Sequence, residues 1–194
     1  MSKKNAFLIY LLLLSTLHVC AQKKFFVTPK IGLNLSTITN VDSDWKSGLN
    51  IGCGVEWLPF SKIGFESGLY YANLGADNVT LENSNTSATV KAGYLQLPLV
   101  VKYYAYKGLH AFAGPQAGYK ISSSEKPVSI LNYGKDFDFS GIIGLGYQFN
   151  FGLVLSANYV AGFTSNDQGF YSTVAHESRN CRNSAFQFNL GWRF

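Results

Sequence analysis

The chain has 194 residues, of which 47% are hydrophobic, 15% aromatic and only 14% charged, with 19 glycines and a formal net charge of +5. This composition excludes a disordered chain, which has few aromatic residues, and a coiled coil, which draws about half its residues from Ala, Glu, Lys, Leu and Arg. The positive charge is small and scattered, whereas nucleic-acid binding needs a basic patch or stripe, so we expect no nucleic-acid partner. The length fits a single domain.

The hydropathy of the chain points to a membrane protein built of strands. Its mean hydropathy of +0.05 is too low for a bundle of membrane helices and high for a soluble protein. Beyond the first 20 residues there is no long apolar run. Such a chain is typical of a membrane β-barrel, because each strand alternates lipid-facing and lumen-facing residues.

Residues 1–21 have the pattern of a cleaved secretion signal. A basic start precedes an apolar stretch that is too short to span a membrane, and small residues follow. We expect cleavage between Ala21 and Gln22, which leaves 22–194 as one mature domain. Lipidation of Cys20 is the less favoured alternative, because a valine precedes it where a lipoprotein signal prefers a small residue.

Eight segments of the mature chain alternate apolar and polar residues with a period of two, which predicts strands with two different faces. Each is long enough to cross a bilayer as a tilted strand. In the clearest one, Phe186, Phe188 and Leu190 share one face, and Gln187 and Asn189 share the other. The predicted strands cover about 25–36, 47–58, 63–74, 91–105, 109–121, 137–149, 151–163 and 185–194.

The connections between these segments alternate in length. Tight turns are predicted at 59–62, at 107–108 and around Asn150, and the long polar connections are 37–46, 75–90, 122–136 and 164–181. Outer-membrane barrels have short periplasmic turns and longer extracellular loops. We therefore predict an all-β fold, an eight-stranded antiparallel up-and-down transmembrane β-barrel. It lies in the lipid of a Gram-negative outer membrane, and both of its termini are periplasmic.

Aromatic residues gather near both ends of the predicted strands, as in the girdles that anchor membrane barrels at the two interfaces. Those near the tight turns are Trp57, Phe60, Phe65, Phe149, Phe151, Trp192 and Phe194, and those near the long connections are Tyr71, Tyr119, Phe137 and Phe163. Packing of aromatic residues in an ordinary β core is the alternative. It is less favoured, because eight strands share the pattern.

Polar side chains of both charges fall on the inward face of the predicted barrel. They are Lys30, Glu56, Glu66, Gln96, Lys102, Lys120 and Arg193. The lumen of an eight-stranded barrel is only wide enough for side chains to fill, and buried charges must pair. We predict a structural polar network that plugs the lumen, with Glu56, Glu66, Lys102 and Arg193 in its periplasmic half. An ion-selective constriction is the alternative.

Several residues could be interpreted as parts of a binding site, but a structural role explains them more simply. The same-face pairs Gly52/Gly54 and Gly144/Gly146 are predicted to relieve crowding within strands, and a phosphate loop is a poor interpretation of them. His110 faces the lumen near a turn, where a hydrogen-bonded interior residue is expected. No cluster of histidine, cysteine and carboxylate has metal-site spacing, so we expect no metal and no cofactor.

Prolines and cysteines add further expectations. Pro98 and Pro115 each remove a donor from the ladder, so a bulge or a local kink is expected at both. Cys53 falls within a predicted strand and Cys181 within a long loop, and we expect two free thiols.

The spacing of His176 and Ser178 resembles the His-x-Ser pair of outer-membrane lipid A deacylases. Here the pair lies in a long polar loop without a strand to fix its geometry, and no carboxylate follows at the place which that family uses. A catalytic triad needs its members held within reach of one another. An outer-leaflet lipid-modifying enzyme is therefore the least favoured function, and we expect no catalytic activity.

The segment 94–103, YLQLPLVVKY, resembles the fourth-strand hallmark of the outer-membrane β-barrel domain common in Bacteroidota, the porin-family or PorT-like proteins. The segments 144–147 and 191–194 fit later strands of that family, and Ala21-Gln22 fits its usual cleavage junction. The resemblance implies fold and location, and it implies hardly anything about activity. Phe194 resembles the terminal aromatic signal recognised by the barrel-assembly machinery, which implies that machinery as a partner during biogenesis.

The sequence therefore predicts an integral outer-membrane protein with a structural or surface-interaction role. Its long connections 75–90 and 164–181 are rich in Asn, Ser, Thr, Asp and Gly, which suits exposed binding loops on a rigid scaffold. They do not identify a surface partner. The alternatives are a narrow porin and an accessory barrel of a protein secretion system, with a partner in that system.

Overall fold

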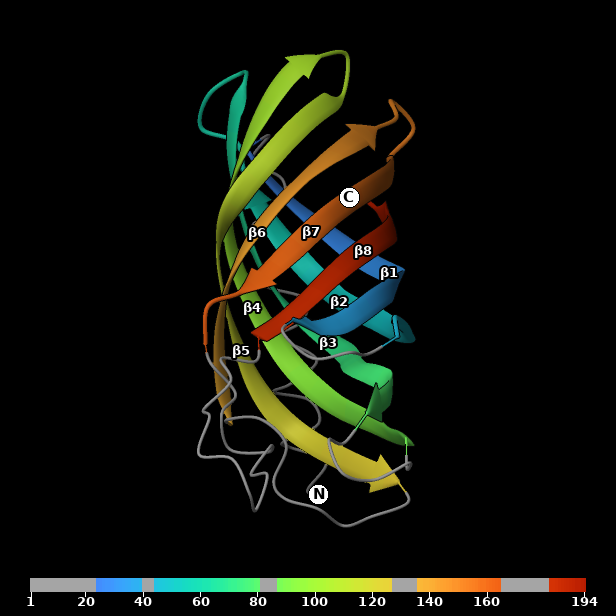
Figure 1. Cartoon of the computed structure of the whole chain (residues 1–194). Coiled ribbons are helices and arrows are strands. Elements are labelled where there is room, and N and C mark those ends of the chain that lie inside the picture. Colours follow the sequence, from blue (N-terminus) through green and yellow to red (C-terminus); the bar gives the residue numbers. More distant parts are fainter. Residues whose placement is uncertain (1–23, 40–43, 81–86, 127–135, 165–181) are drawn as a thin grey trace, which may run out of the picture.

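The computed structural model describes residues 24–39, 44–80, 87–126, 136–164 and 182–194. They form eight antiparallel strands, each paired with its sequence neighbours, and the first pairs with the last to close a barrel (Figure 1). The predicted eight-stranded fold is confirmed. The strands are β1 (Phe25–Thr39), β2 (Lys46–Trp57), β3 (Ile63–Thr80), β4 (Ser87–Tyr106), β5 (Leu109–Lys126), β6 (Phe137–Gln148), β7 (Leu153–Gly162) and β8 (Arg182–Trp192).

The predicted strand bounds are close at the tight turns, but those of β3, β4 and β5 are too short toward the long connections. β3 continues to Thr80, β4 begins at Ser87 and β5 continues to Lys126. The ladder between β3 and β4 accordingly extends to the pair Thr80 and Ser87. Alternation marks only the part of a strand that has one apolar face, so hydrogen-bonded pairing that extends beyond it leaves no such signal.

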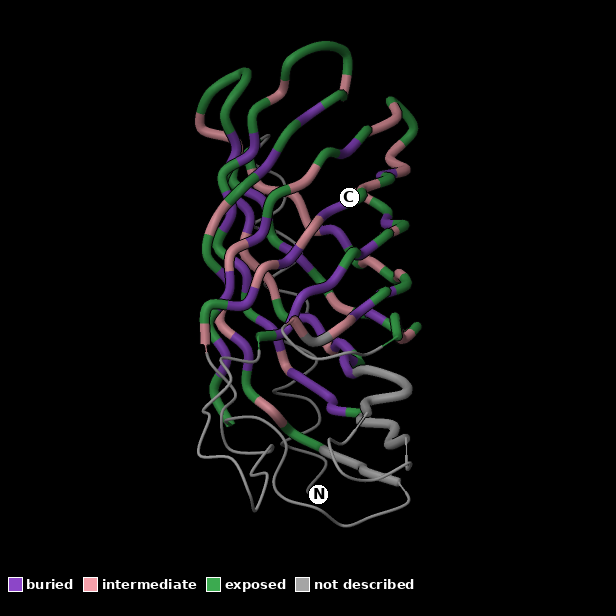
Figure 2. The backbone as a smooth tube through the Cα atoms, in the orientation of Figure 1, coloured by how far each residue is buried: buried purple, intermediate pink, exposed green. Residues whose placement is uncertain are grey.

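The outer wall is apolar and the interior is mostly polar. Burial alternates along the strands (Figure 2), and Leu33, Ile143 and Leu145 on the wall are each more than 60% exposed. Buried Asn34, Gln116 and other polar side chains face inward. An apolar surface of this extent suits lipid as its solvent. No helix long and apolar enough to span a membrane occurs among the described residues.

The tight turns lie together at one end of the barrel, at the top of Figure 1. In the turn between β4 and β5, Lys107 and Gly108 both have positive φ, as a two-residue hairpin turn of type I′ requires. The described chain ends lie here too, because Phe25 pairs with Trp57 and the Phe194 N–H donates to the Val27 carbonyl at 3.0 Å. Periplasmic placement of this end stays a prediction.

Outward aromatic side chains are present at both ends of the wall. At the end with the tight turns, the Trp57 ring lies 6.2 Å from Phe25 and 5.8 Å from Phe65, measured between centroids. At the other end, Tyr119 and Phe137 are register partners on neighbouring strands, and both are more than half exposed. Their positions suit two headgroup regions, where amphipathic rings are favoured.

At Pro98 and Pro115, where a bulge or a local kink is expected, the ladders contain no bulge. Pro98 pairs with Gln116, Pro115 pairs with Gly141, and the register is unchanged across both. A missing N–H removes one hydrogen bond, whereas a bulge needs an extra residue in one strand. The register shifts lie between Ala76 and Val79, between Gly93 and Tyr94, and between Tyr104 and Tyr106.

The glycine pair Gly52/Gly54 makes room for an interior ring, as predicted. A Cβ atom at Gly52 would lie 2.5 Å from Cδ1 of Tyr70, and one at Gly54 would lie 2.5 Å from the Tyr70 hydroxyl oxygen. Real Cβ contacts are never this short. The Tyr70 side chain therefore occupies the space that two side chains on β2 would fill.

Candidate functional site

Charged side chains from four strands meet inside the barrel near the end with the tight turns. Lys30, Glu56, Glu66 and Lys102 project inward from β1, β2, β3 and β4, and Arg193 follows β8. Their side chains are between 1% and 12% exposed. We call these five residues the lumen charge cluster. Three cations thus share two carboxylates.

Lys102 lies between two carboxylates that face each other. Glu56 and Glu66 are direct register partners on β2 and β3. Like charges at such positions repel, so the pair needs a cation close by. The Lys102 ammonium on β4 lies 3.3 Å from Glu56 Oε2 and 2.5 Å from Glu66 Oε2. It compensates both carboxylates at once.

Lys30 forms the second ion pair of the cluster. Its ammonium donates to Glu66 Oε1 and lies 5.7 Å from the centroid of the Tyr70 ring. The Tyr70 hydroxyl donates to the same carboxylate oxygen at 3.3 Å. Glu66 therefore binds groups from β1, β3 and β4, which ties one side of the barrel together.

Arg193 covers the cluster toward the tight turns. Its guanidinium lies 3.5 Å from the centroid of the Phe26 ring, and Nη2 lies 3.8 Å from Glu56 Oε2. Nη1 donates to the Gln148 side-chain oxygen and, at 3.4 Å, to the Tyr104 hydroxyl. That hydroxyl in turn donates to Glu56 Oε1 at 2.6 Å. This network joins the end of the chain to β1, β2, β4 and β6.

Two residues predicted for the polar network are inward but lie outside the lumen charge cluster. Gln96 is buried on β4, six residues away from Lys102 along the strand. Lys120 lies near the opposite end of the barrel, where its ammonium is 3.5 Å from Asp136 Oδ1. Alternation assigns a side chain to the inward face, but it does not give the depth of that side chain in the lumen.

A chain of amide hydrogen bonds crosses the interior beside the cluster. Asn50 Nδ2 donates to Asn189 Oδ1 at 2.8 Å, and Asn189 Nδ2 donates to Asn158 Oδ1 at 3.1 Å. Asn158 Nδ2 then donates to Gln187 Oε1 at 2.8 Å. Sequence reasoning missed these residues as a unit. Their inward positions were readable from the alternation, whereas their partners depend on strand register.

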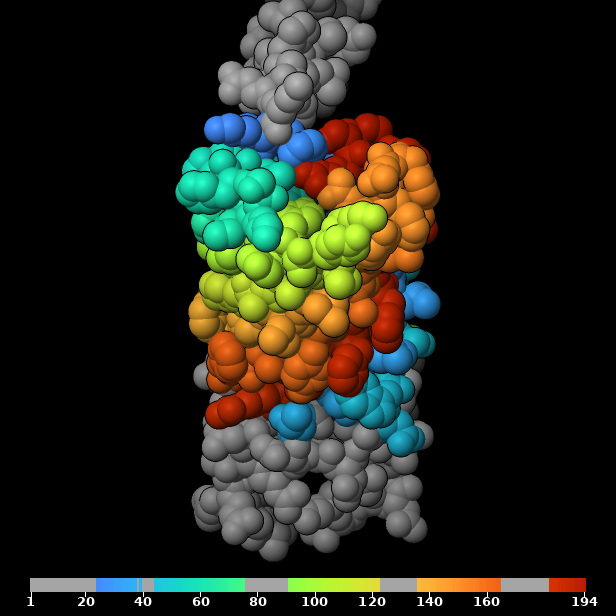
Figure 3. Space-filling model, turned by 90° about the horizontal axis from the view of Figure 1, so that it is seen from above, coloured from blue at the N-terminus to red at the C-terminus, as the bar shows by residue number. Residues whose placement is uncertain are grey.

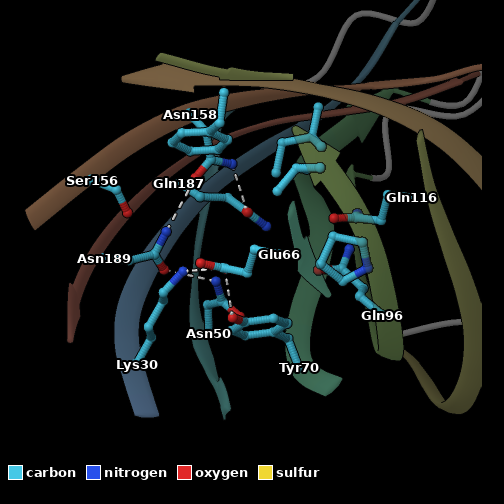
Figure 4. Close-up of a pocket in the computed structure, with 14 residues that line it drawn as sticks. Lys30, Asn50, Glu66, Tyr70, Gln96, Gln116, Ser156, Asn158, Gln187 and Asn189 are labelled. Atoms are coloured by element: carbon cyan, nitrogen blue, oxygen red, sulfur yellow. Dashed lines mark hydrogen bonds and ion pairs between the residues drawn. The ribbon is translucent and has the colours of Figure 1, made fainter. Parts of the chain in front are cut away.

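A small cavity in the lumen is lined both by Lys30 and Glu66 of the charge cluster and by apolar side chains (Figure 4). Its volume is about 40 Å³, which holds a few water molecules. Its apolar lining includes Val100, Phe112 and Ile142, so the cavity contacts both the ion pairs and the apolar cluster. That apolar cluster comprises Ala72, Leu74, Ala92, Tyr94, Val100, Phe112, Ile142, Val160 and Ala185.

His110 is a hydrogen-bonded interior residue, as predicted. It is 1% exposed, its Nδ1 lies 3.0 Å from the Gly108 carbonyl oxygen, and its ring packs 4.9 Å from that of Tyr104. Cys53 is a free thiol exposed on the outer wall. In the described part of the chain, no group of three His, Cys, Asp or Glu side chains could hold a metal ion.

Some predicted positions lie outside the described residues. They are the cleavage positions Ala21 and Gln22, the His176 and Ser178 pair, and Cys181. Phe194 is described, and the residue is 69% exposed.

A closed barrel with an apolar wall, aromatic residues at both ends of it and a filled polar interior defines a transmembrane β-barrel. The model of the outer membrane protein beta-barrel domain family matches residues 20–168, and the chain belongs to this family. The protein is therefore an outer-membrane barrel of a Gram-negative bacterium. No curated protein matches the sequence.

Solved structures share this architecture at low sequence identity. Neisserial surface protein A is 11% identical with a TM-score of 0.52, and the match covers 88% of this chain and 97% of that one. The outer membrane protein OprG from Pseudomonas aeruginosa is 12% identical with a TM-score of 0.52, covering 88% and 96%. At this identity the similarity shows the fold alone.

Proposed function

We propose that the protein is a closed, non-conducting barrel that acts as a rigid support for surface interactions through its long connections. The observation that carries this proposal is the filling of the lumen. Lys102 binds two facing carboxylates, and Arg193 covers one of them toward the end of the barrel. An ion crossing here has to displace paired charges in a narrow space, which is costly.

The same contacts favour a stiff scaffold. The lumen charge cluster joins β1 to β4 and the segment after β8, and the amide chain joins β2, β7 and β8. Cross-lumen bonds of this kind oppose bending of the wall. A rigid barrel that presents long connections at one end suits binding without catalysis.

The proposal includes an orientation. The tight turns and the described chain ends share one end of the barrel. In outer-membrane barrels the short turns are periplasmic and the longer loops extracellular. We therefore place both termini in the periplasm and the connections around 75–90 and 164–181 outside the cell. The resemblance to PorT-like proteins keeps a secretion-system partner as the second candidate.

Planar-bilayer recording tests the closed lumen. The purified barrel is expected to give no current steps, whereas steady conductance on the nanosiemens scale would overturn the proposal in favour of a pore.

The surface role is tested by replacing 166–179 with a Gly-Ser linker of equal length. We expect the variant to fold, as judged by heat-modifiable migration on gels, and to lose partners that cross-link to the intact protein on cells. A deletion strain with an altered secretion profile and no loss of surface cross-links would favour the secretion role.

A further inference from the structure

The end of the barrel with the tight turns carries exposed positive charge. Lys24 precedes β1, Lys62 precedes β3, and Lys107 lies in the turn between β4 and β5, and all three are exposed. The carboxylates nearest this end in the described chain, Glu56 and Glu66, are buried in the lumen charge cluster. We call Lys24, Lys62 and Lys107 the basic arc, since no Asp or Glu side chain of the described residues offsets them at the surface.

The basic arc occupies one side of this end. The Leu58 N–H donates to the Lys24 carbonyl at 2.7 Å, and the Tyr104 N–H donates to the Lys62 carbonyl at 2.8 Å. These bonds link the start of β1, the turn between β2 and β3, and β4. Lys107 follows β4 directly, so the arc extends from β1 to β5. In Figure 3 the teal and yellow-green segments that include these turns lie next to each other.

The opposite side of the same end is aromatic, and no charged side chain of the described residues is exposed on it. The turn at 149–152 reads Phe-Asn-Phe-Gly, and the Phe151 ring lies 6.0 Å from that of Trp192. Arg193 is the cation on this side among the described residues, and its side chain is turned into the lumen with 7% exposure. By its described side chains, one half of the end is therefore basic and the other is neutral.

Aromatic side chains place the basic arc at the membrane interface. The Lys107 ammonium lies 5.1 Å from the centroid of the Tyr106 ring, which is 67% exposed. Phe60, two residues before Lys62, is 64% exposed. Exposed rings at the ends of barrel strands favour the headgroup level. The ammonium groups beside them then lie where lipid phosphates lie.

We propose that the basic arc binds the phosphate groups of anionic glycerophospholipids and concentrates these lipids on the β1 to β5 side of the barrel. Each ammonium offers a full charge and three donors to phosphate oxygens. Lysines near an anionic surface each favour binding several-fold at low ionic strength. The proposal depends on the placement in a membrane, and it does not depend on a closed lumen or on a role for the long connections.

The three tryptophans of the chain provide matched reporters. Trp57 lies beside the arc on β2 and Trp192 on the neutral side, with exposed fractions of 44% and 43%. The pair W45F and W192F leaves Trp57 alone, and the pair W45F and W57F leaves Trp192 alone. Each protein is folded into phosphatidylcholine vesicles that contain a minor fraction of brominated phosphatidylglycerol or brominated phosphatidylcholine. Quenching by bromine reports the local concentration of the brominated lipid.

We expect brominated phosphatidylglycerol to quench Trp57 more than brominated phosphatidylcholine does, with a local enrichment of about threefold or more at low salt. Trp192 is expected to respond equally to the two lipids. Replacing the arc by K24Q, K62Q and K107Q abolishes the excess at Trp57, whereas K24R, K62R and K107R preserve it. If the glutamine variant does not fold, the protein with the unaltered arc is measured at increasing salt concentration instead. Salt screens the attraction between lysine and phosphate and should remove the excess quenching of Trp57.

Three outcomes would overturn the proposal. They are equal quenching of Trp57 by the two lipids, an equal phosphatidylglycerol excess at Trp192, and an excess at Trp57 that survives both neutralisation of the arc and high salt.

Discussion

The ammonium of Lys102 lies 2.5 Å from Glu66 Oε2 inside the barrel, on the strand next to it. The two residues are diagonal in the ladder, since Lys102 pairs with Gly64 and Glu66 with Val100. This position also brings the ammonium to 3.3 Å from Glu56 Oε2. Lys102 therefore separates two carboxylates that the register of β2 and β3 places face to face.

Replacing Lys102 by methionine is expected to lower the free energy of unfolding by about 3 kcal/mol, because it removes the shared cation and leaves two facing carboxylates buried. Urea unfolding in lipid vesicles, followed by tryptophan fluorescence, measures the loss. Lys91 on the same strand is exposed, and K91M serves as the control with a change within about 0.5 kcal/mol. Adding E66Q to K102M should recover part of the loss. Equal stability of K102M and K91M would contradict the assigned role.

Gly146, of the pair Gly144/Gly146, leads to a prediction about which interior glycines tolerate a side chain. A Cβ atom at Gly146 would lie 2.5 Å from Nε2 of His110, which is 1% exposed. At Gly118 the nearest atom, Cδ1 of Tyr94, would be 3.6 Å away, an ordinary contact. We expect G146A to destabilise the barrel by about 1–3 kcal/mol through overpacking, and G118A to be tolerated. The unfolding experiment measures both, and a G118A loss as large as that of G146A would refute this account.

If the apolar outer wall spans the lipid, the stability lost to an arginine on the wall should depend on its depth in the bilayer. Ile143 lies near the middle of β6 and is 63% exposed on the wall, whereas Phe137 begins the same strand. Arginine at the bilayer midplane costs about 2–4 kcal/mol and near an interface about 0–1 kcal/mol. We expect I143R to be the more destabilising of the two arginine variants, and I143M to be nearly neutral. Equal losses for I143R and F137R in vesicles would be inconsistent with a wall that spans the lipid.

Sequence reasoning recovered the strands and their faces because both follow from local alternation. It could not recover partners in the lumen, which depend on register and depth. Gln96 and Lys102 share a strand and a face, yet only Lys102 reaches the carboxylates. The contact between Arg193 and Phe26 joins the two ends of the described chain. No local pattern signals a contact of that kind, because closure of the barrel creates it.

Arg193 provides the last prediction, because its side chain is nearly as buried as that of Lys102 but is placed differently. Its Nε and Nη2 atoms lack hydrogen-bond partners among the described residues, and its closest approach to Glu56 is 3.8 Å. Removing it leaves two cations with two carboxylates. Lys102 then still separates the facing carboxylates.

We therefore expect R193M to cost about 1–2 kcal/mol, less than K102M, since the variant loses the cation over the Phe26 ring but keeps an apolar contact with it. R193K tests geometry separately from charge, because lysine keeps the charge and loses the planar fork that reaches Gln148 and Tyr104. Measured side by side in urea, the order of loss should be K102M, then R193M, then K91M. A loss for R193M equal to or above that of K102M would mean that the guanidinium, and not the shared ammonium, holds the cluster together.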